Sequence, residues 1–338
     1  MSLTGRGTRK KKSSLLRKLA VLIVILLVIL VAVIALWYLL AGRLPKPIPT
    51  PPGPERPNAQ PASCPDVQVV VVPGTWESSA ADDPYNPSAN PASLMLNVSR
   101  PLQEQFESSR ADVYTVPYVA QFSNPVAFPP DGQQSYNNSR GAGTAATNDI
   151  LIRRHAECPL TSFLLTGFSQ GAVIAGDVAS SIGAGDGPVP ADLVLGVGLI
   201  ADGRRDPAAA TNVGQPVAGV GAELSLAGLQ IPGITMTGPR PGGFGDLTDR
   251  AVEICAPSDG ICDAPAQALK PSNWIGSGLR LLEYNNNPVH AMYRRRSPRP
   301  GRRHECRAAG RRCRRRTVAA GPADPRNHDD RSPPRRFR

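Results

Sequence analysis

The sequence predicts an α/β fold of three layers, in which a mainly parallel sheet carries helices on both faces. Short β-branched runs alternate with helical segments across residues 64–293, and parallel strands need such crossovers. At Gly167-Phe168-Ser169-Gln170-Gly171 an apolar run also passes directly into an Ala/Val/Ile-rich run. A strand that reverses abruptly into a helix needs residues without Cβ on either side of the turn, and the serine at the apex then stands above the sheet.

The first predicted strand is Val67–Val72 (VQVVVV), a continuous β-branched run that is typical of a strand buried on both faces. Residues 91–107 are mostly helical in pattern, although Pro101 favours a break or a second helix start. The remaining predicted elements are a strand at 111–118, a Gly/Ser/Asn/Pro-rich loop at 122–143, a helix at 145–157, the strand before Ser169, a helix to Ile182, and strands at 191–200 and 250–255.

Charge is distributed unevenly along the 338 residues, whose formal net charge is +11. Residues 1–44 hold eight Lys and Arg residues and no acid, and residues 294–338 hold seventeen Arg residues against four acids. The residues between them, 45–293, hold 13 basic and 23 acidic residues. Since the surplus positive charge sits at the two ends, the basic total does not indicate a nucleic-acid partner.

Residues 19–40 form an unbroken apolar run of 22 residues, which is long enough to cross the roughly 30 Å core of a bilayer. Seven Lys and Arg residues precede it, and Trp37 and Tyr38 sit near its far end. By the positive-inside rule, this pattern predicts a single-pass anchor with a cytoplasmic N-terminus and an extracytoplasmic remainder. A buried core helix and a long cleaved signal sequence are the alternatives.

The chain after the anchor divides by composition. Eight prolines at 45–61 favour extended polyproline II and predict a semi-rigid spacer. The expected organisation is a basic cytoplasmic segment at 1–18, the anchor at 19–40, a linker at 41–63, a catalytic domain at 64–293 and a tail at 294–338.

Four cysteines lie in the central region: Cys64, Cys158, Cys255 and Cys262. An even number outside the cytoplasm predicts disulfides, and three pairings are possible. Zinc ligation is the competing interpretation, but the chain has no CxxC pair and only four histidines. We therefore expect no metal and no cofactor.

A serine hydroxyl is a poor nucleophile unless an imidazole takes its proton and a carboxylate orients that imidazole. In hydrolases built on this kind of elbow, the acid and the histidine follow the serine in that order. Downstream of Ser169 and before residue 294 the sequence contains one histidine, His290, whereas His155 precedes the elbow on a predicted helix. His290 is therefore the candidate base for Ser169.

The acid is less well defined by order alone, because several aspartates follow the serine: Asp186, Asp192, Asp202, Asp206, Asp246, Asp249, Asp259 and Asp263. Asp259 is distinctive since it lies inside Cys255-Ala-Pro-Ser-Asp-Gly-Ile-Cys262. A disulfide between those cysteines would close a small loop after a strand and fix the carboxylate. Alternatively, Asp259 makes a turn with Ser258 and Gly260.

Three segments in the same order resemble the cutinase family of serine esterases, and more narrowly its membrane-anchored members from mycobacterial cell envelopes. These segments are ASCPDVQVVVVPGTWES around Cys64, AECPLTSFLLTGFSQGA around Cys158, and CAPSDGIC. The resemblance covers residues 64–293 and implies the α/β hydrolase-like fold of that family.

The resemblance also implies roles for individual residues. Ser169 would be the nucleophile, Asp259 the acid and His290 the base. Thr75 and the backbone N–H of Gln170 would form the oxyanion hole. The implied disulfides are Cys64 with Cys158 and Cys255 with Cys262.

The chain departs from the family's small fungal members in two places. The segment from Asp259 to His290 is longer, and an apolar rim for long acyl chains or ordinary helix core are the two interpretations of its residues Trp274, Ile275, Leu279, Leu281 and Leu282. After Tyr293 the sequence becomes rich in arginine and proline. We favour out-of-frame coding for this tail over a disordered polybasic arm, because Arg/Pro/Ala/Gly-rich sequence is what GC-rich DNA encodes out of frame.

The expected function is hydrolysis of lipid acyl esters, which include fatty acyl esters, phospholipids and thioesters, by a monomeric enzyme at the cell envelope. An envelope acyltransferase with the same three residues, and an inactive envelope-binding protein, are the alternatives.

Overall fold

The computed structural model describes residues 12–41, 56–125, 127–266, 268–273, 276 and 288–295. The chain divides into two compact units, Met1–Ala59 and Gln60–Arg338. The predicted rim residues Trp274, Ile275, Leu279, Leu281 and Leu282 and the tail from residue 296 lie outside the described residues.

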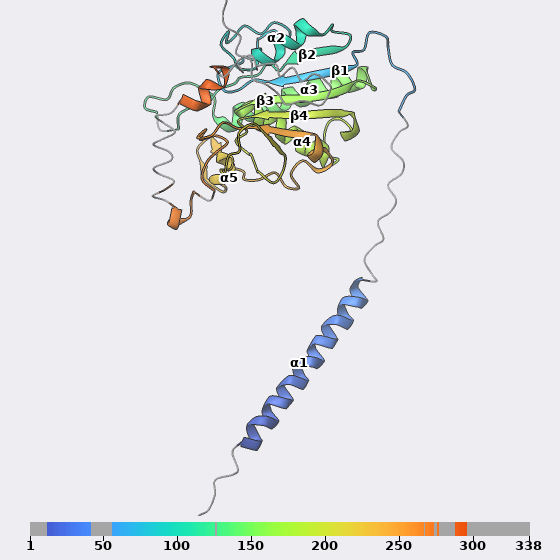
Figure 1. Cartoon of the computed structure of the whole chain (residues 1–338), viewed down its shortest axis with the longest axis vertical. Coiled ribbons are helices and arrows are strands. Elements are labelled where there is room, and N and C mark those ends of the chain that lie inside the picture. Colours follow the sequence, from blue (N-terminus) through green and yellow to red (C-terminus); the bar gives the residue numbers. More distant parts are fainter. Residues whose placement is uncertain are drawn as a thin grey trace, which may run out of the picture. The chain divides into compact units, whose positions relative to one another are not determined.

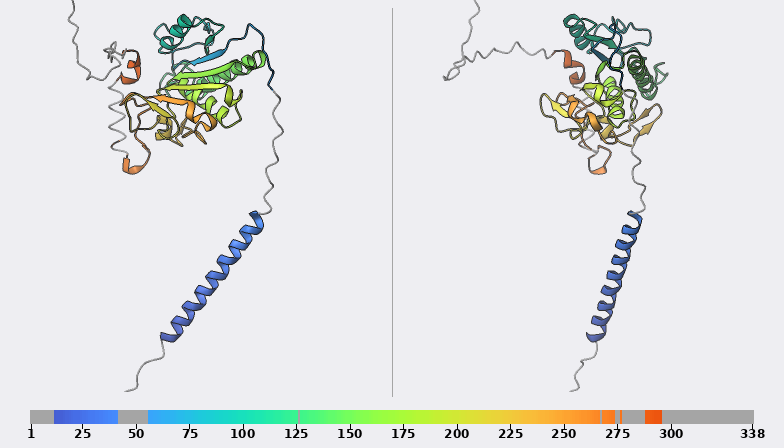
Figure 2. Two further views of the ribbon diagram at one scale, coloured as in Figure 1. Left: turned by 45° about the vertical axis from the view of Figure 1, so that its right-hand side comes forward. Right: turned by 90° about the vertical axis from the view of Figure 1, so that its right-hand side faces the viewer.

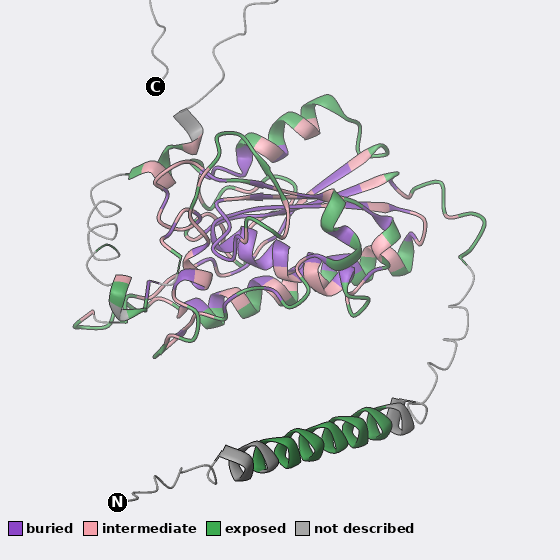
Figure 3. Ribbon diagram, turned by 60° about the horizontal axis from the view of Figure 1, so that its bottom comes forward, coloured by how far each residue is buried: buried purple, intermediate pink, exposed green. Residues whose placement is uncertain are grey.

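The first unit contains one long helix, α1 (Lys12–Ala41). Its side chains are exposed from Lys18 to Trp37 (Figure 3), and this stretch has a mean hydropathy of 3.7. By length and composition α1 can cross a membrane, as a helix near the N-terminus that serves either as an anchor or as a signal sequence.

The second unit is built on a sheet in which the described strands run in the order β2-β1-β3-β4-β8-β5, every pair parallel. Figure 1 shows β2, β1, β3 and β4 side by side in this order. The strands are β1 (Val67–Val72), β2 (Ala111–Thr115), β3 (Ser162–Phe168), β4 (Val194–Ile200), β5 (Thr211–Val213) and β8 (Ala251–Ile254). The prediction of a mainly parallel sheet is confirmed.

Both faces of the sheet are covered, because alternate residues of β1 belong to different core clusters. Val70 and Val72 pack in one cluster with residues of α3 and α4, while Val69 and Val71 pack in another with Met95 and residues of α2. This is the two-residue period of a strand that is buried on both faces. The main helices are α2 (Leu96–Gln105), α3 (Tyr136–Glu157) and α4 (Gln170–Gly183), and Figure 2 shows them from two further sides.

Helix α3 begins nine residues earlier than predicted, so the expected loop at 122–143 is shorter. The Ser135 side chain accepts a hydrogen bond from the Asn138 N–H and caps the helix. Gly143 allows α3 to pack closely here, since a Cβ would lie 2.5 Å from Ile174 Cδ1 of α4 and 3.0 Å from Tyr118 Cδ2. Tertiary contacts with α4 therefore outweigh the low helix propensity of these residues.

Three further details of the predicted secondary structure were wrong. Pro101 lies inside α2 and does not break it. The predicted strand at 191–200 starts with a 3-10 turn, η1 (Ala191–Leu193). Three short strands were not predicted, namely β5 and the antiparallel pair β6 (Gln230–Ile231) and β7 (Ile234–Thr235).

Two disulfides are present, and they close loops of very different size. Cys64–Cys158 spans 94 residues and joins the chain before β1 to the chain before β3. Cys255–Cys262 spans seven residues and closes the loop after β8.

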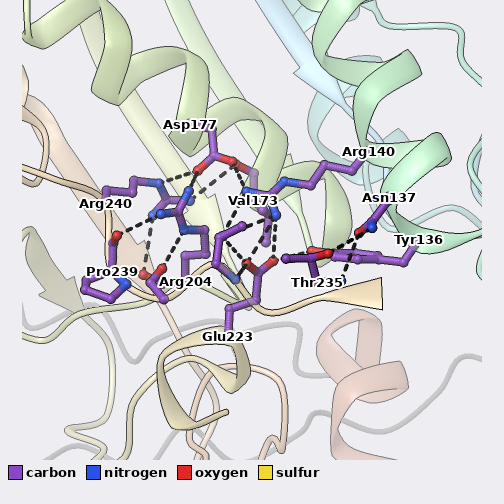
Figure 4. A network of polar contacts seen from close by, with 12 residues as sticks. Tyr136, Asn137, Arg140, Val173, Asp177, Arg204, Glu223, Thr235, Pro239 and Arg240 are labelled. Atoms are coloured by element: carbon purple, nitrogen blue, oxygen red, sulfur yellow. Dashed lines mark hydrogen bonds and ion pairs between the residues drawn. The ribbon is translucent and has the colours of Figure 1, made fainter. Parts of the chain in front are cut away.

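A buried ionic network holds the segment between β4 and β8 against α3 and α4 (Figure 4). Asp177 of α4 is its centre, because its carboxylate accepts from Arg204 at 2.7 Å and from Arg240 at 2.9 Å and also binds Arg140 of α3. Arg240 in turn makes two hydrogen bonds to Asp202, at 2.6 and 3.1 Å. The guanidinium groups thereby join segments that are far apart in sequence.

Glu223, in the short helix α5 (Ala222–Ser225), extends the network. It accepts two bonds of 3.2 Å from Arg140 and one of 2.6 Å from the Thr237 hydroxyl, and it also binds the Tyr136 hydroxyl. With three arginines against Asp177, Asp202 and Glu223, the network balances its charges, as a buried ionic cluster must.

Burial by itself raises the pKa of Asp177, but the nearby charges of Arg240, Arg140 and Arg204 outweigh it and hold the pKa below its ordinary value. Asp177 therefore contributes stability that is fully present above the pKa of an unfolded Asp and is lost as the pH falls through the lower folded value.

We predict that Asp177→Asn lowers the free energy of unfolding by about 3 to 5 kcal/mol at neutral pH, since it leaves buried guanidinium groups without their partner. Urea unfolding followed by circular dichroism measures this change. The matched control is Asp66→Asn, whose pair with Arg110 is largely exposed and should be worth less than about 1 kcal/mol. A D177N penalty that does not shrink below about pH 4 would contradict the role given to this carboxylate.

We predict that removal of one disulfide mainly lowers the stability of the fold and that removal of the other mainly lowers catalytic activity. A link across 94 residues restricts the unfolded chain by about 4 to 5 kcal/mol and one across seven residues by about 2 to 3 kcal/mol. We expect C64S/C158S to lose more stability, and C255S/C262S to lose more of the ester hydrolysis that the sequence predicts, because that loop carries Asp259, the acid that the resemblance implies. Thermal unfolding and esterase assays on the same samples measure both, and the reverse ranking would show that the assignment is wrong.

Candidate active site

Ser169 lies at the turn between β3 and α4 with a φ of 54° and a ψ of −120°, a conformation that few non-glycine residues adopt. A Cβ on Gly167 would lie 2.2 Å from the Gly171 carbonyl oxygen, and a Cβ on Gly171 would lie 2.2 Å from the Val72 carbonyl oxygen. The glycines on either side of the serine are thus required by backbone contacts, and the serine at the apex carries the strain.

Ser169, His290 and Asp259 form a continuous chain of hydrogen bonds. His290 Nε2 lies 2.9 Å from Ser169 Oγ, and His290 Nδ1 lies 2.9 Å from Asp259 Oδ2 and 3.1 Å from Oδ1. A neutral imidazole with its proton on Nδ1 donates to the carboxylate and presents Nε2 as an acceptor to the serine hydroxyl. The arrangement can therefore remove the proton of Ser169.

Asp259 is completely buried, with an exposed fraction of 0%. Its Oδ1 accepts from the Ile261 N–H at 2.9 Å, and its Oδ2 accepts from the Tyr293 hydroxyl at 2.7 Å. These donors and the disulfide of its loop fix the carboxylate in one orientation, so the turn that was considered as an alternative role also serves to aim Asp259.

The His290 ring is held by packing as well. It stacks on Phe168, the residue before the serine, with 4.9 Å between ring centroids and 21° between planes. His290 belongs to η4 (Pro288–Arg295), a 3-10 helix. The serine's own strand thus supplies the surface on which the histidine rests.

Thr75 follows the end of β1, and Gln170 follows the end of the neighbouring strand β3. Gly74, next to Thr75, packs so closely on β3 that a Cβ there would lie 2.8 Å from Phe168 Cδ1 and 3.1 Å from the Phe168 carbonyl oxygen. Gln170 is the first residue of α4, so its N–H has no acceptor within the helix. The turn that carries Thr75 and the start of α4 therefore both lie next to Phe168 and Ser169.

The Gln170 side chain has a structural role that we did not predict from the sequence. Its buried Oε1 lies 3.0 Å from the Ser139 hydroxyl oxygen and 3.4 Å from the Tyr118 hydroxyl oxygen. The Tyr118 hydroxyl donates its proton to the Pro73 carbonyl oxygen at 2.7 Å. This network ties α3, α4 and the turn that carries Thr75 together.

Sequence reasoning also missed Tyr293 and Phe168, which contact the predicted acid and base. Tyr293 follows His290 by three residues, and in a 3-10 helix such residues share one face. That spacing was the available signal, but it is visible only once the helix type is known. Among the described residues, no group of three or more His, Cys, Asp or Glu side chains could hold a metal ion.

Comparison with known proteins identifies the family to which the chain belongs. The sequence profile of the cutinase family matches residues 63–275. The carboxylesterase Culp6 homolog of Corynebacterium glutamicum is 50% identical over 243 residues, which cover 70% of this chain and 76% of that protein.

The chain also has similarity to proteins of solved structure. The catalytic core of acetyl xylan esterase from Trichoderma reesei has 19% identity and a TM-score of 0.43 over 68% of this chain and 98% of its own. A cutinase-like protein from Cryptococcus sp. has 22% identity and a TM-score of 0.39 over 69% and 98%. With its elbow serine, its parallel sheet, the match of the family profile and this close carboxylesterase relative, the chain is a carboxylic ester hydrolase that belongs to the cutinase family.

Proposed function

We propose that this protein hydrolyses acyl esters of lipids at the cell envelope, with Ser169 as nucleophile, His290 as general base and Asp259 as the acid that orients it. The observation that carries the proposal is the hydrogen-bond chain from Ser169 Oγ through His290 to Asp259, whose members come from positions 169, 290 and 259. Three such groups meet in this order wherever a serine is activated by this mechanism.

In the first step, His290 Nε2 takes the hydroxyl proton as Ser169 Oγ attacks the ester carbonyl carbon. The charge that develops on the imidazole is stabilised by Asp259, which lies 2.9 Å from Nδ1. When the tetrahedral intermediate collapses, the imidazolium gives its proton to the leaving alcohol and an acyl enzyme remains. Water then repeats the sequence and releases the fatty acid.

The negative oxygen of the tetrahedral intermediate needs donors that are already in place. The Gln170 N–H at the start of α4 and the Thr75 hydroxyl and N–H serve this purpose in the proposal. Gln170 is held by its buried side chain, and the Thr75 turn is held by the close packing of Gly74 on Phe168. Fixed donors cost little reorganisation when the charge appears.

Lipids are the proposed substrates because the catalytic unit would lie at the membrane, in the cell envelope. The apolar helix from Lys18 to Trp37 and the basic residues before it favour a single-pass anchor with the catalytic unit outside the cytoplasm. Two disulfides fit an oxidising compartment. An esterase tethered in this way meets envelope lipids at high local concentration.

We predict that Ser169→Ala lowers kcat for p-nitrophenyl butyrate and p-nitrophenyl palmitate by at least about 10⁴-fold, since the nucleophile is lost. A fluorophosphonate probe should label the wild type and not the variant. Ser108→Ala, which changes an exposed serine, is the matched control and should keep full activity and labelling. Equal rates for wild type and S169A would refute the assignment of the nucleophile.

We also predict that Thr75→Val, which keeps the shape of the side chain but removes its hydroxyl, lowers kcat by about 100- to 1000-fold with little change in KM. Steady-state kinetics with p-nitrophenyl butyrate measures both constants. The control is Thr211→Val, at an exposed position in β5. A rise in KM at unchanged kcat would place Thr75 in substrate binding instead.

A further inference from the structure

Tyr293 approaches the same carboxylate as His290, from the same face of the same helix. Both residues belong to η4 and are three positions apart, and side chains at i and i+3 of a 3-10 helix eclipse one another. His290 contacts Asp259 Oδ2 at 2.9 Å, and the Tyr293 hydroxyl contacts the same oxygen at 2.7 Å. One helical turn therefore delivers the base and a second donor to one acid.

The direction of the Tyr293 proton follows from its other neighbour. The Ala256 N–H donates to the Tyr293 oxygen at 2.9 Å, so this oxygen acts as acceptor there and its own proton points to Asp259. Ala256 and Asp259 lie in the same disulfide loop. The hydroxyl thus bridges the loop that carries the acid and the helix that carries the base.

Packing leaves the Tyr293 ring little freedom. The rings of Tyr293 and Phe168 pack edge to face with 5.7 Å between their centroids, and the Tyr293 ring stands nearly perpendicular to that of His290 at a centroid distance of 6.3 Å. Burial and the charge of Asp259 raise the pKa of Tyr293, so the phenol stays protonated and remains a donor at every pH at which an esterase works.

We propose that Tyr293 is a positioning residue for the reaction, because its hydroxyl holds the Asp259 carboxylate in the orientation that aims His290 at Ser169 and takes up part of the carboxylate's negative charge. This inference rests on the proposed function of Ser169, His290 and Asp259. It adds a fourth side chain, which touches neither the substrate nor the reacting atoms.

The electrostatic consequence has a definite sign. Without the Tyr293 hydroxyl, Oδ2 of Asp259 keeps more negative charge and binds the protonated form of His290 more strongly. The base is then unprotonated only at higher pH, so the acid limb of the profile of kcat/KM against pH moves upward. Two titratable groups lie against His290: Asp259, which is hydrogen-bonded to it, and Tyr293. The charge of Arg205 acts on Tyr293. Phe168 of β3, which stacks on His290, is uncharged.

The test is Tyr293→Phe in the full-length protein, assayed with p-nitrophenyl butyrate. Loss of a hydrogen bond to a charged group should lower kcat by about 10- to 100-fold, with KM unchanged and the acid limb shifted to higher pH. The low-field proton resonance of the His290–Asp259 hydrogen bond should also move, which can be measured without turnover.

The matched control is Tyr85→Phe. The Tyr85 hydroxyl also contacts an aspartate oxygen, Asp112 Oδ2 at 3.4 Å, and its ring also meets another ring edge to face, that of Tyr114. It lies outside the site described above, so Y85F should leave kcat, the pH profile and the proton resonance as in the wild type. A second variant, Tyr293→3-fluorotyrosine, keeps the shape of the side chain with a stronger donor and should move the acid limb to lower pH.

The outcomes separate this inference from the function on which it rests. If Ser169→Ala abolishes hydrolysis while Y293F matches Y85F in kcat, pH profile and resonance, the proposed function stands and the role of Tyr293 is overturned. A lower kcat in Y293F with an unmoved acid limb and resonance would also overturn it, because a purely structural defect has that signature. If Ser169→Ala retains full hydrolysis, the proposed function itself fails.

Discussion

The backbone contact between the turn after β1 and the start of α4 determines where the rest of the site lies. Gly171 and the carbonyl oxygen of Val72 approach so closely that no side chain fits between them, and Ser169, two residues before Gly171, has a positive φ. Gly74, the residue before Thr75, packs closely on Phe168 at the end of β3. Because the strands are parallel and adjacent, their carboxyl ends meet at one edge, where ligands bind in sheets of this class.

The partners of the serine depend on longer-range constraints. Asp259 reaches the site through the disulfide loop after β8, and His290 rests on the ring of Phe168. The long segment between β4 and β8 is fastened to α3 and α4 by the ionic network around Asp177, in addition to the apolar packing of Phe244 and Leu247 in the core cluster that contains α4. Removing one partner of such a network leaves a buried charge without its counter-ion and is strongly destabilising. The position of this segment therefore depends on every member of the network.

Much of this arrangement could be predicted from sequence, and the reasons differ by residue. The elbow was visible because two glycines and a serine have a local steric explanation, and the alternation of strands and helices sufficed for the sheet. The start of α3 was missed because Gly143 fits α4 through a contact that only the folded state contains. The Asp177 network and the hydroxyl of Tyr293 were missed for the same reason: their partners come from distant segments, and charge or aromatic character alone does not reveal a partner.

In the proposed mechanism Ser169, His290 and Asp259 act together beneath an oxyanion hole formed by Thr75 and Gln170. A crystal structure of the protein after reaction with a p-nitrophenyl alkylphosphonate tests it most directly, since the phosphonyl group imitates the tetrahedral intermediate. We expect phosphorus bonded to Ser169 Oγ, one phosphonyl oxygen within hydrogen-bonding distance of Thr75 and the Gln170 N–H, and His290 still hydrogen-bonded to Asp259. An adduct on another residue, or a phosphonyl oxygen turned away from both donors, would contradict it.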